Sequence, residues 1–177
     1  MNGYNFLLMQ KSIIPTRGVI TRTAEIDIDS SIDKVFNYIS AEESLTKFLK
    51  KYGPIHAVEK HETHKGPWTM PGAYRTLYFE SGDTLREDLL IFNPFTYFAY
   101  SISEFSNVTK HLSGIAYGQF AFTTRENKTH VTWTYSFKPK NFFTAIPLSI
   151  FMSLYFKKYM QQGLKISKGD IEGSESK

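Results

Sequence analysis

Residues 130–168 of the chain, HVTWTYSFKPKNFFTAIPLSIFMSLYFKKYMQQGLKISK, contain a strand pattern followed directly by a helix pattern. Bulky side chains at every second position of residues 130–137 predict a β-strand with one buried face. They are Val131, Trp133, Tyr135 and Phe137. From Thr144 to Lys168 the sequence predicts one long helix, with Pro147 in the first turn, where its missing N–H does least harm. The chain is therefore expected to end in a strand and a long helix.

Upstream of this stretch the same alternation predicts six more strands, separated by Gly, Pro and Asn turns. They span Val19–Ile28, Ile55–Glu62, Ala73–Glu80, Thr84–Phe92, Tyr97–Phe105 and Tyr117–Arg125. Two short helices are expected between the first and second of these strands. Capping boxes at Ser30/Asp33 and Ser40/Glu43 indicate where they begin. Strands in a run, with helices set apart from them, predict an α+β fold.

The composition predicts a soluble globular domain with an unusually aromatic interior. Phe and Tyr number 15 and 11 among 177 residues, which suits either a wide core or an apolar pocket. The absence of cysteine excludes disulfides and thiolate catalysis. The net charge is only +4, and no basic stripe alternates with exposed aromatic residues. We therefore expect no nucleic-acid partner.

Three segments are predicted along the chain. Residues 1–16 are an N-terminal extension, because the apolar run at Phe6–Met9 is too short for a secretory signal. Residues 17–168 form one domain. Residues 169–177, GDIEGSESK, have the composition of a flexible tail. This organisation predicts a cytoplasmic protein and leaves association with a membrane open.

Five local phrases of the sequence support a family resemblance. They are Asp33–Ser40 (DKVFNYIS), Gly66–Gly72 (GPWTMPG), Gly82–Phe92 (GDTLREDLLIF), Phe98–Ser103 (FAYSIS) and His130–Phe137 (HVTWTYSF). With the order of elements, they resemble the START/polyketide-cyclase superfamily, SRPBCC, over residues 18–168. The resemblance implies a helix-grip fold, in which a curved antiparallel sheet of about six or seven strands wraps around the long C-terminal helix. It also implies a deep cavity. Members bind lipids, sterols, quinones or polyketides, and some catalyse cyclisation or dehydration.

Arg75 and Glu87 stand out because strand parity places each of them on an otherwise apolar face. They lie in the two strands of a predicted hairpin around Ser81–Asp83, so they are expected to meet across it. One hypothesis makes them the polar floor of a pocket. Arg75 would then anchor a ligand oxygen, and Glu87 would orient the ligand or act as a catalytic base. The other hypothesis is a structural ion pair.

Aromatic residues on the same predicted faces and in the last helix complete the predicted pocket. In a cavity, a tyrosine hydroxyl can orient a ligand oxygen, whereas in a packed core the same residues only fill space. The predicted ligand-binding residues are Arg75, Glu87, Tyr100, Phe120, Phe122, Trp133, Tyr135, Phe151 and Tyr155.

No metal ion or cofactor is expected. His56, His61 and His64 are close in sequence, but their spacing on a strand or loop does not match the helical His-Glu-x-x-His arrangement. Nucleophile elbows, phosphate-binding glycine loops and dinucleotide fingerprints are also missing from the sequence.

The predicted last helix is apolar on nearly all sides from Ala145 to Phe156. It is too short to span a membrane, so it is either gripped by the sheet or faces a membrane or a second copy. Three functions follow as alternatives. The first is carriage of a small hydrophobic ligand, and the second is a polyketide cyclase/dehydratase-type enzyme that uses Glu87 and Arg75. The third is a membrane-surface module. The sequence leaves monomer and homodimer open.

Overall fold

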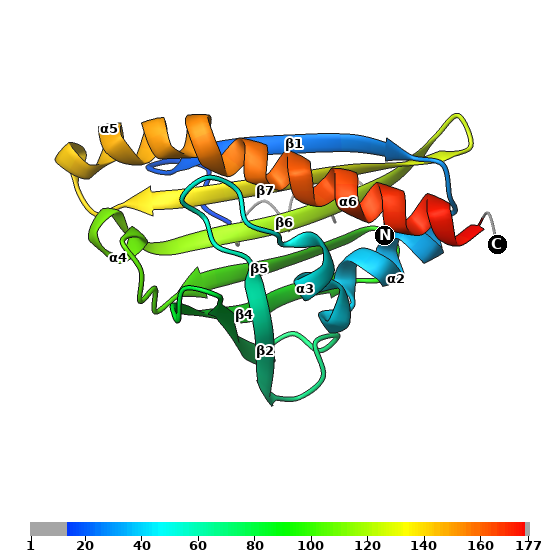
Figure 1. Ribbon diagram of the computed structural model, residues 1–177, viewed down its shortest axis with the longest axis horizontal. Coiled ribbons are helices and arrows are strands. Elements are labelled where there is room, and N and C mark those ends of the chain that lie inside the picture. Colours follow the sequence, from blue (N-terminus) through cyan, green and yellow to red (C-terminus); the bar gives the residue numbers. More distant parts are fainter. Residues whose placement is uncertain (1–13, 176–177) are drawn as a thin grey trace, which may run out of the picture.

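The computed structural model describes residues 14–175 of the chain, which form one antiparallel sheet with helices on one face (Figure 1). The strands are β1 (Ile20–Ile28), β2 (Val58–Lys65), β3 (Tyr74–Phe79), β4 (Thr84–Asn93), β5 (Tyr97–Ser103), β6 (Ser113–Arg125) and β7 (Lys128–Pro139). The helical segments are α2 (Ile32–Ser40), η1 (Glu42–Ser44), α3 (Leu45–Phe48), α4 (Thr109–Leu112), α5 (Phe142–Phe151), η2 (Met152–Phe156) and α6 (Lys157–Glu175).

The seven strands lie in the order β1-β7-β6-β5-β4-β3-β2, and every neighbouring pair is antiparallel. Because β1 pairs with β7, the first and last strands lie side by side, while β2 forms the far edge. The C-terminal helix runs along the β1/β7 side and contacts β1, α2 and α3 (Figure 1). This is the helix-grip arrangement that the family resemblance implies.

Helix α2 closes one end of the space between sheet and helix. Val35, Phe36 and Ile39 recur at helical spacing and are all buried. The helix begins after Ser31, whose side chain makes no capping hydrogen bond, so the capping box predicted at Ser30 is wrong. The second predicted box is also absent, since η1 and α3 both begin without a side-chain cap. Burial of the apolar face, and not capping, therefore stabilises these short helices.

The C-terminal helix is continuous but not uniform, because five residues, Met152–Phe156, form a π-helical turn between α5 and α6. Helix α5 begins at Phe142 with a capping box between Asn141 and Thr144. Pro147 thus lies in the second turn and not in the first turn that the sequence analysis predicted. A π turn holds an extra residue, so the side chains beyond it are rotated relative to a plain α-helix.

Residues 169–175 continue helix α6, which corrects the flexible tail predicted from their composition. Ile171 is buried, the Tyr38 hydroxyl donates to Asp170, and Glu172 accepts from the backbone N–H of Asp29. Tertiary contacts thus override the weak helix propensity of this glycine- and serine-rich segment. The predicted N-terminal extension falls outside the described residues, apart from residues 14–16.

Strand β2 forms an edge of the sheet and is polar along almost its whole length. Its sequence is VEKHETHK, and only Val58 is buried. The pairing of β2 with β3 shifts register twice, between Val58 and Lys60 and again between Thr63 and Lys65. The edge is therefore charged and irregular.

Candidate functional site: an apolar cavity with a polar inner end

A cavity of about 590 Å³ lies between the sheet and the C-terminal helix. Its walls come from β3, β4, β5, β7, the loop before β2, the segment around α4, and the helix from α5 to α6. Apolar side chains make up most of the lining, which is typical of sites for small hydrophobic molecules. They include Leu49, Ile55, Val58, Leu77, Phe79, Leu85, Ile102, Phe105, Val108, Phe137, Phe151 and Phe156.

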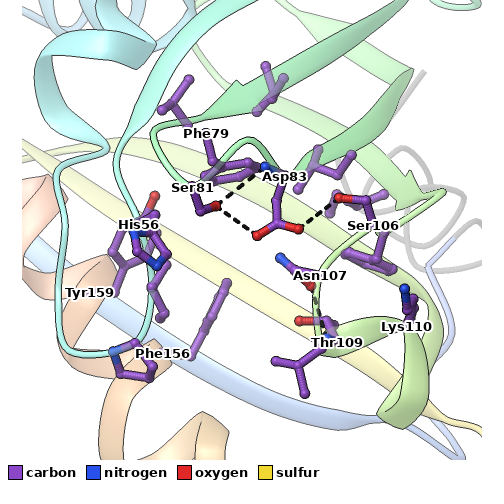
Figure 2. A pocket seen from close by; sticks show the side chains of 18 of the residues that line it. His56, Phe79, Ser81, Asp83, Ser106, Asn107, Thr109, Lys110, Phe156 and Tyr159 are labelled. Atoms are coloured by element: carbon purple, nitrogen blue, oxygen red, sulfur yellow. Dashed lines mark hydrogen bonds between the residues drawn. The ribbon is translucent and has the colours of Figure 1, made fainter.

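Polar side chains form the mouth of the cavity. The hydroxyls of Ser81 and Ser106 donate to the two carboxylate oxygens of Asp83, at 2.7 and 2.9 Å. These bonds, that of Ser81 above all, lower the pKa of Asp83. In Figure 2, His56 and Tyr159 lie on one side of the pocket, and Ser106 and Lys110 lie on the other. The mouth thus carries both signs of charge, and the hydrogen-bonded Asp83 joins the β3–β4 turn to the segment before α4.

Glu87 marks the inner end of the cavity. It lines the cavity, whereas the next inward-facing residue on the same strand, Leu89, does not. On the neighbouring strand, Leu77 lines the cavity and Arg75 does not. A ligand entering from the mouth would therefore meet the Glu87 carboxylate, with the guanidinium of Arg75 behind it.

Arg75 and Glu87 face each other across the β3–β4 hairpin, as the strand parity predicts. Both are buried, and Glu87 Oε2 accepts from Arg75 Nε at 2.8 Å and lies 2.6 Å from Arg75 Nη2. The guanidinium carbon lies 3.6 Å from the centre of the Trp68 ring, which holds it as a cation–π partner. Both contacts involve Oε2, so Oε1 is left without a hydrogen-bond partner among the described residues.

Tyrosine hydroxyls from three elements meet near this carboxylate. Tyr100 of β5 donates to Tyr135 of β7 at 3.2 Å, and Tyr135 and Tyr159 line the cavity. Gly118 of β6 lies between the two strands, opposite both Tyr100 and Tyr135. A Cβ at Gly118 would lie 2.6 Å from the Tyr100 hydroxyl. The hydrogen bond between Tyr100 and Tyr135 therefore requires glycine at position 118. No residue that the structure describes hydrogen-bonds the Tyr159 hydroxyl, which leaves it available to a ligand.

Burial governs the ionisation of this inner end. It raises the pKa of the Glu87 carboxyl, and the Arg75 guanidinium opposes that shift. Burial also raises the pKa values of Tyr100, Tyr135 and Tyr159 well above the usual range, and the Glu87 charge adds to each shift. The phenols are therefore neutral hydrogen-bond donors at physiological pH.

The π turn decides which aromatic residues of the C-terminal helix reach the cavity. Phe151 and Phe156, five residues apart, both line it. The Phe156 ring centre lies 4.8 Å from that of Tyr135 and 5.1 Å from that of Phe137. Tyr155 does not line the cavity, and its ring packs over Gly53 instead. Of the two helix residues predicted to bind ligand, Phe151 and Tyr155, only Phe151 therefore lines the cavity, and Phe156 takes the place expected of Tyr155.

Three more predicted ligand-binding residues, Phe120, Phe122 and Trp133, lie in the packed core outside the lining of the cavity. Phe36 of α2 fills this end of the molecule, with its ring centre 5.1 Å from that of Phe122. Phe120 stacks on Trp133 at 4.8 Å. Of the residues predicted to bind ligand, the structure thus places Glu87, Tyr135 and Phe151 at the cavity, while Arg75 and Tyr100 contact Glu87 and Tyr135 from behind.

Several lining residues were missed by the sequence analysis. Those of the mouth, such as Asp83, Ser106 and Lys110, lie in turns, where no periodic pattern indicates which way a side chain points. Tyr159 of α6, which also lines the cavity, was not among the predicted residues. Two of the missed residues, Leu77 and Phe79, could have been found from strand parity, which places them on the same face as Arg75.

The three clustered histidines have separate surroundings. His56 lies at the mouth of the cavity, His61 Nε2 is 3.6 Å from Glu42, and His64 stacks on Tyr74. Among residues 14–175, no group of three or more His, Asp or Glu side chains is arranged to hold a metal ion. Within the same part of the chain, no helix is both long and apolar enough to cross a bilayer.

The fold and the cavity define a helix-grip protein of the SRPBCC superfamily. A family model described as polyketide cyclase/dehydrase and lipid transport matches residues 19–172, and the chain belongs to that family. The search of curated proteins finds no match.

Solved structures resemble the chain over most of its length. The protein XoxI from Bacillus cereus is 22% identical, with a TM-score of 0.65, and the match covers 88% of this chain and 97% of that one. Ara h 8.0201 is 14% identical, with a TM-score of 0.65 and coverages of 88% and 99%. The major latex-like protein 151 from Panax ginseng is 11% identical, with a TM-score of 0.64 and coverages of 86% and 97%. At these identities the likeness establishes the fold alone.

Proposed function

We propose that this protein binds and carries a neutral, largely apolar molecule with one hydroxyl group or similar polar end. The observation that carries the proposal is the cavity of about 590 Å³, whose lining is mostly apolar and whose inner end carries Glu87, Tyr135 and Tyr159. Family membership supports a hydrophobic ligand. The cavity falls within the usual size range of small-molecule sites.

The inner end selects the polar group of the ligand. The free Oε1 of Glu87 accepts a hydrogen bond, and the neutral Tyr159 hydroxyl donates one, so together they suit a hydroxyl group. A ligand carboxylate would instead face the Glu87 carboxylate in a buried place, where like charges repel strongly. Arg75 neutralises Glu87 from behind and does not face the ligand. The proposal therefore favours alcohols, phenols or sterol-like molecules over fatty acids.

Native mass spectrometry of the freshly purified protein is the first test. We expect a near-stoichiometric adduct that extraction identifies as a neutral, mostly apolar molecule. An empty protein that also fails to bind the fluorescent apolar probe Nile red would contradict carriage.

A competition assay tests the role of Glu87. Dodecanol should displace Nile red at a concentration about tenfold lower than dodecanoate, because burying the acid beside Glu87 disfavours its charged form. In Glu87→Gln the preference should shift towards dodecanoate, since Arg75 is then unneutralised. Asp88→Asn is the matched control, because Asp88 is the next residue on β4 and pairs with Arg86. Tyr159→Phe should weaken dodecanol binding and leave the fold intact. Equal affinities in the wild type would refute the selectivity.

A second candidate, a cyclase/dehydratase-type enzyme, rests on the same carboxylate. Glu87 faces the cavity with a free oxygen, and burial raises its pKa, as a general base requires. Its pairing with Arg75 opposes this role, because a paired carboxylate stays ionised and is a weak base. Turnover of an aromatic polyketide mimic that is lost in Glu87→Gln, with ligand binding retained, would favour the enzyme.

A further inference from the structure

A row of large apolar side chains lies exposed along the outer side of α5 and η2. It consists of Phe142, Phe143, Ile146, Ile150 and Leu154, and we call it the α5 face. The two phenylalanines are 78% and 84% exposed. From Phe143 onward the members recur every three or four residues, so they share one side of the helix. Single exposed apolar residues are ordinary, but a contiguous row marks an interaction surface.

The α5 face lies away from the side of the helix that packs on the rest of the molecule. The opposite side of the same helix supplies Leu148 and Met152, both completely buried, which attach it to the rest of the molecule. The α5 face therefore adds apolar surface that has no partner among the described residues.

The charged side chains of the segment that contains the α5 face are all of one sign. Residues 127–169 contain seven lysines and no Asp or Glu. Lys140 precedes α5, and Lys157 and Lys158 follow η2, where a lysine four residues after Leu154 continues the same side of the helix. All three are exposed, and none forms an ion pair with a residue that the structure describes. They are free to contact anionic groups of a partner.

We propose that the α5 face docks on the surface of an anionic lipid bilayer. Phe142 and Phe143 would enter the boundary between headgroups and acyl chains, and the lysines would contact anionic headgroups. A second copy of the chain fits less well, because two such faces would bring their unpaired lysines together. This docking concerns the outer surface and does not depend on the ligand proposed above.

The position of the α5 face relates the bilayer to the cavity. Helix α4 contacts α5, and both lie at the same end of the molecule (Figure 1). Val108, directly before α4, is exposed and also lines the cavity. Docking would therefore bring the mouth of the cavity close to the membrane surface, where an apolar ligand could be exchanged without crossing water.

Co-sedimentation with vesicles tests the docking. The full chain should bind vesicles of phosphatidylcholine with phosphatidylglycerol much more than vesicles of phosphatidylcholine alone, and salt should weaken the binding. The double variant Phe142→Ser/Phe143→Ser should reduce binding to the anionic vesicles by more than about tenfold. Lys157→Glu/Lys158→Glu should reduce it as well.

Matched controls separate docking from general stickiness. Met70→Ser removes an exposed apolar side chain from the β2–β3 loop, and Lys65→Glu changes a charge at the end of β2. Both should bind the anionic vesicles like the wild type. Unchanged circular dichroism would show that each variant is folded. The proposal fails if the phenylalanine variant binds the vesicles as the wild type does. It also fails if the wild type sediments as a dimer and does not bind vesicles, while the phenylalanine variant sediments as a monomer. Loss of vesicle binding with Nile red binding intact would leave the proposed carriage untouched.

Discussion

Helices α5 and α6 form one continuous rod, yet they bury their residues very differently. In α6, Met160, Leu164, Ser167 and Ile171 recur every three or four residues and are all buried. A Cβ at Gly163 would lie 3.3 Å from both the Phe48 carbonyl and the Trp133 ring, so α6 packs closely on α3 and the sheet. In α5, only Leu148 is buried, and apolar side chains face outward.

This difference distinguishes apolar residues that stabilise the fold by being buried from apolar residues that are exposed and do not. Helix α6 has a polar outer side and a buried inner side, as a helix that stabilises a domain should. Helix α5 has apolar residues on both sides, and the π turn lies where one pattern changes into the other. The two helices should therefore respond very differently to truncation of their side chains.

The largest expected effect is in α6. Leu164→Ala should lower the free energy of unfolding by about 2–5 kcal/mol, because it removes a buried side chain and leaves a cavity. Ile150→Ala in α5 should change it by less than about 0.5 kcal/mol, because this side chain is exposed. Urea denaturation measures both. Similar losses in the two variants would show that α5 also carries the fold.

The π turn offers an intermediate effect. Phe156→Ala should cost about 2 kcal/mol and alter ligand binding, because its ring packs on Tyr135 and Phe137 and lines the cavity. Tyr155→Ala should cost less than about 1 kcal/mol and leave the cavity unchanged. Thermal unfolding and Nile red binding would check both variants. The reverse order of effects would mean that the helix keeps a plain α-helical register here.

The smallest effect concerns the support of this turn from β1. Arg22 donates to the Ser149 carbonyl and to the hydroxyls of Ser149 and Ser153. Arg22→Ala should lower the free energy of unfolding by about 0.5–1.5 kcal/mol and speed amide hydrogen exchange in residues 152–156. Arg17→Ala removes the same charge from an exposed position and should do neither. Unchanged exchange in Arg22→Ala would show that the turn does not need this support.

Strand parity explains how much of the fold and the site could be predicted from the sequence. A strand has a period of two, so Arg75 and Glu87 were placed on one face and opposite each other from their positions alone. Parity says which face a residue occupies but not where along the strand a cavity ends and a packed core begins. Phe120, Phe122 and Trp133 were placed on the inner face, but Phe36 of α2 fills the space there.

The helical part of the site was less predictable. A period of 3.6 residues assumes a plain α-helix, and no residue type in Met152–Phe156 indicates a π turn. One extra residue moves Phe156 to the cavity and Tyr155 away from it. The tail was misjudged because composition predicts local propensity only, whereas Ile171 and Asp170 are held by contacts far away in sequence.

The edge strand β2 has a consequence for the protein at high concentration. An open sheet exposes unpaired backbone groups at its edge, and a flat, apolar edge invites strands of other molecules to add to it. With the sequence VEKHETHK and two register shifts, β2 offers charges and an uneven backbone instead. At the β2 edge, therefore, the sheet does not readily accept strands of other molecules, even at concentrations where the exposed apolar helix face would bring copies of the protein together.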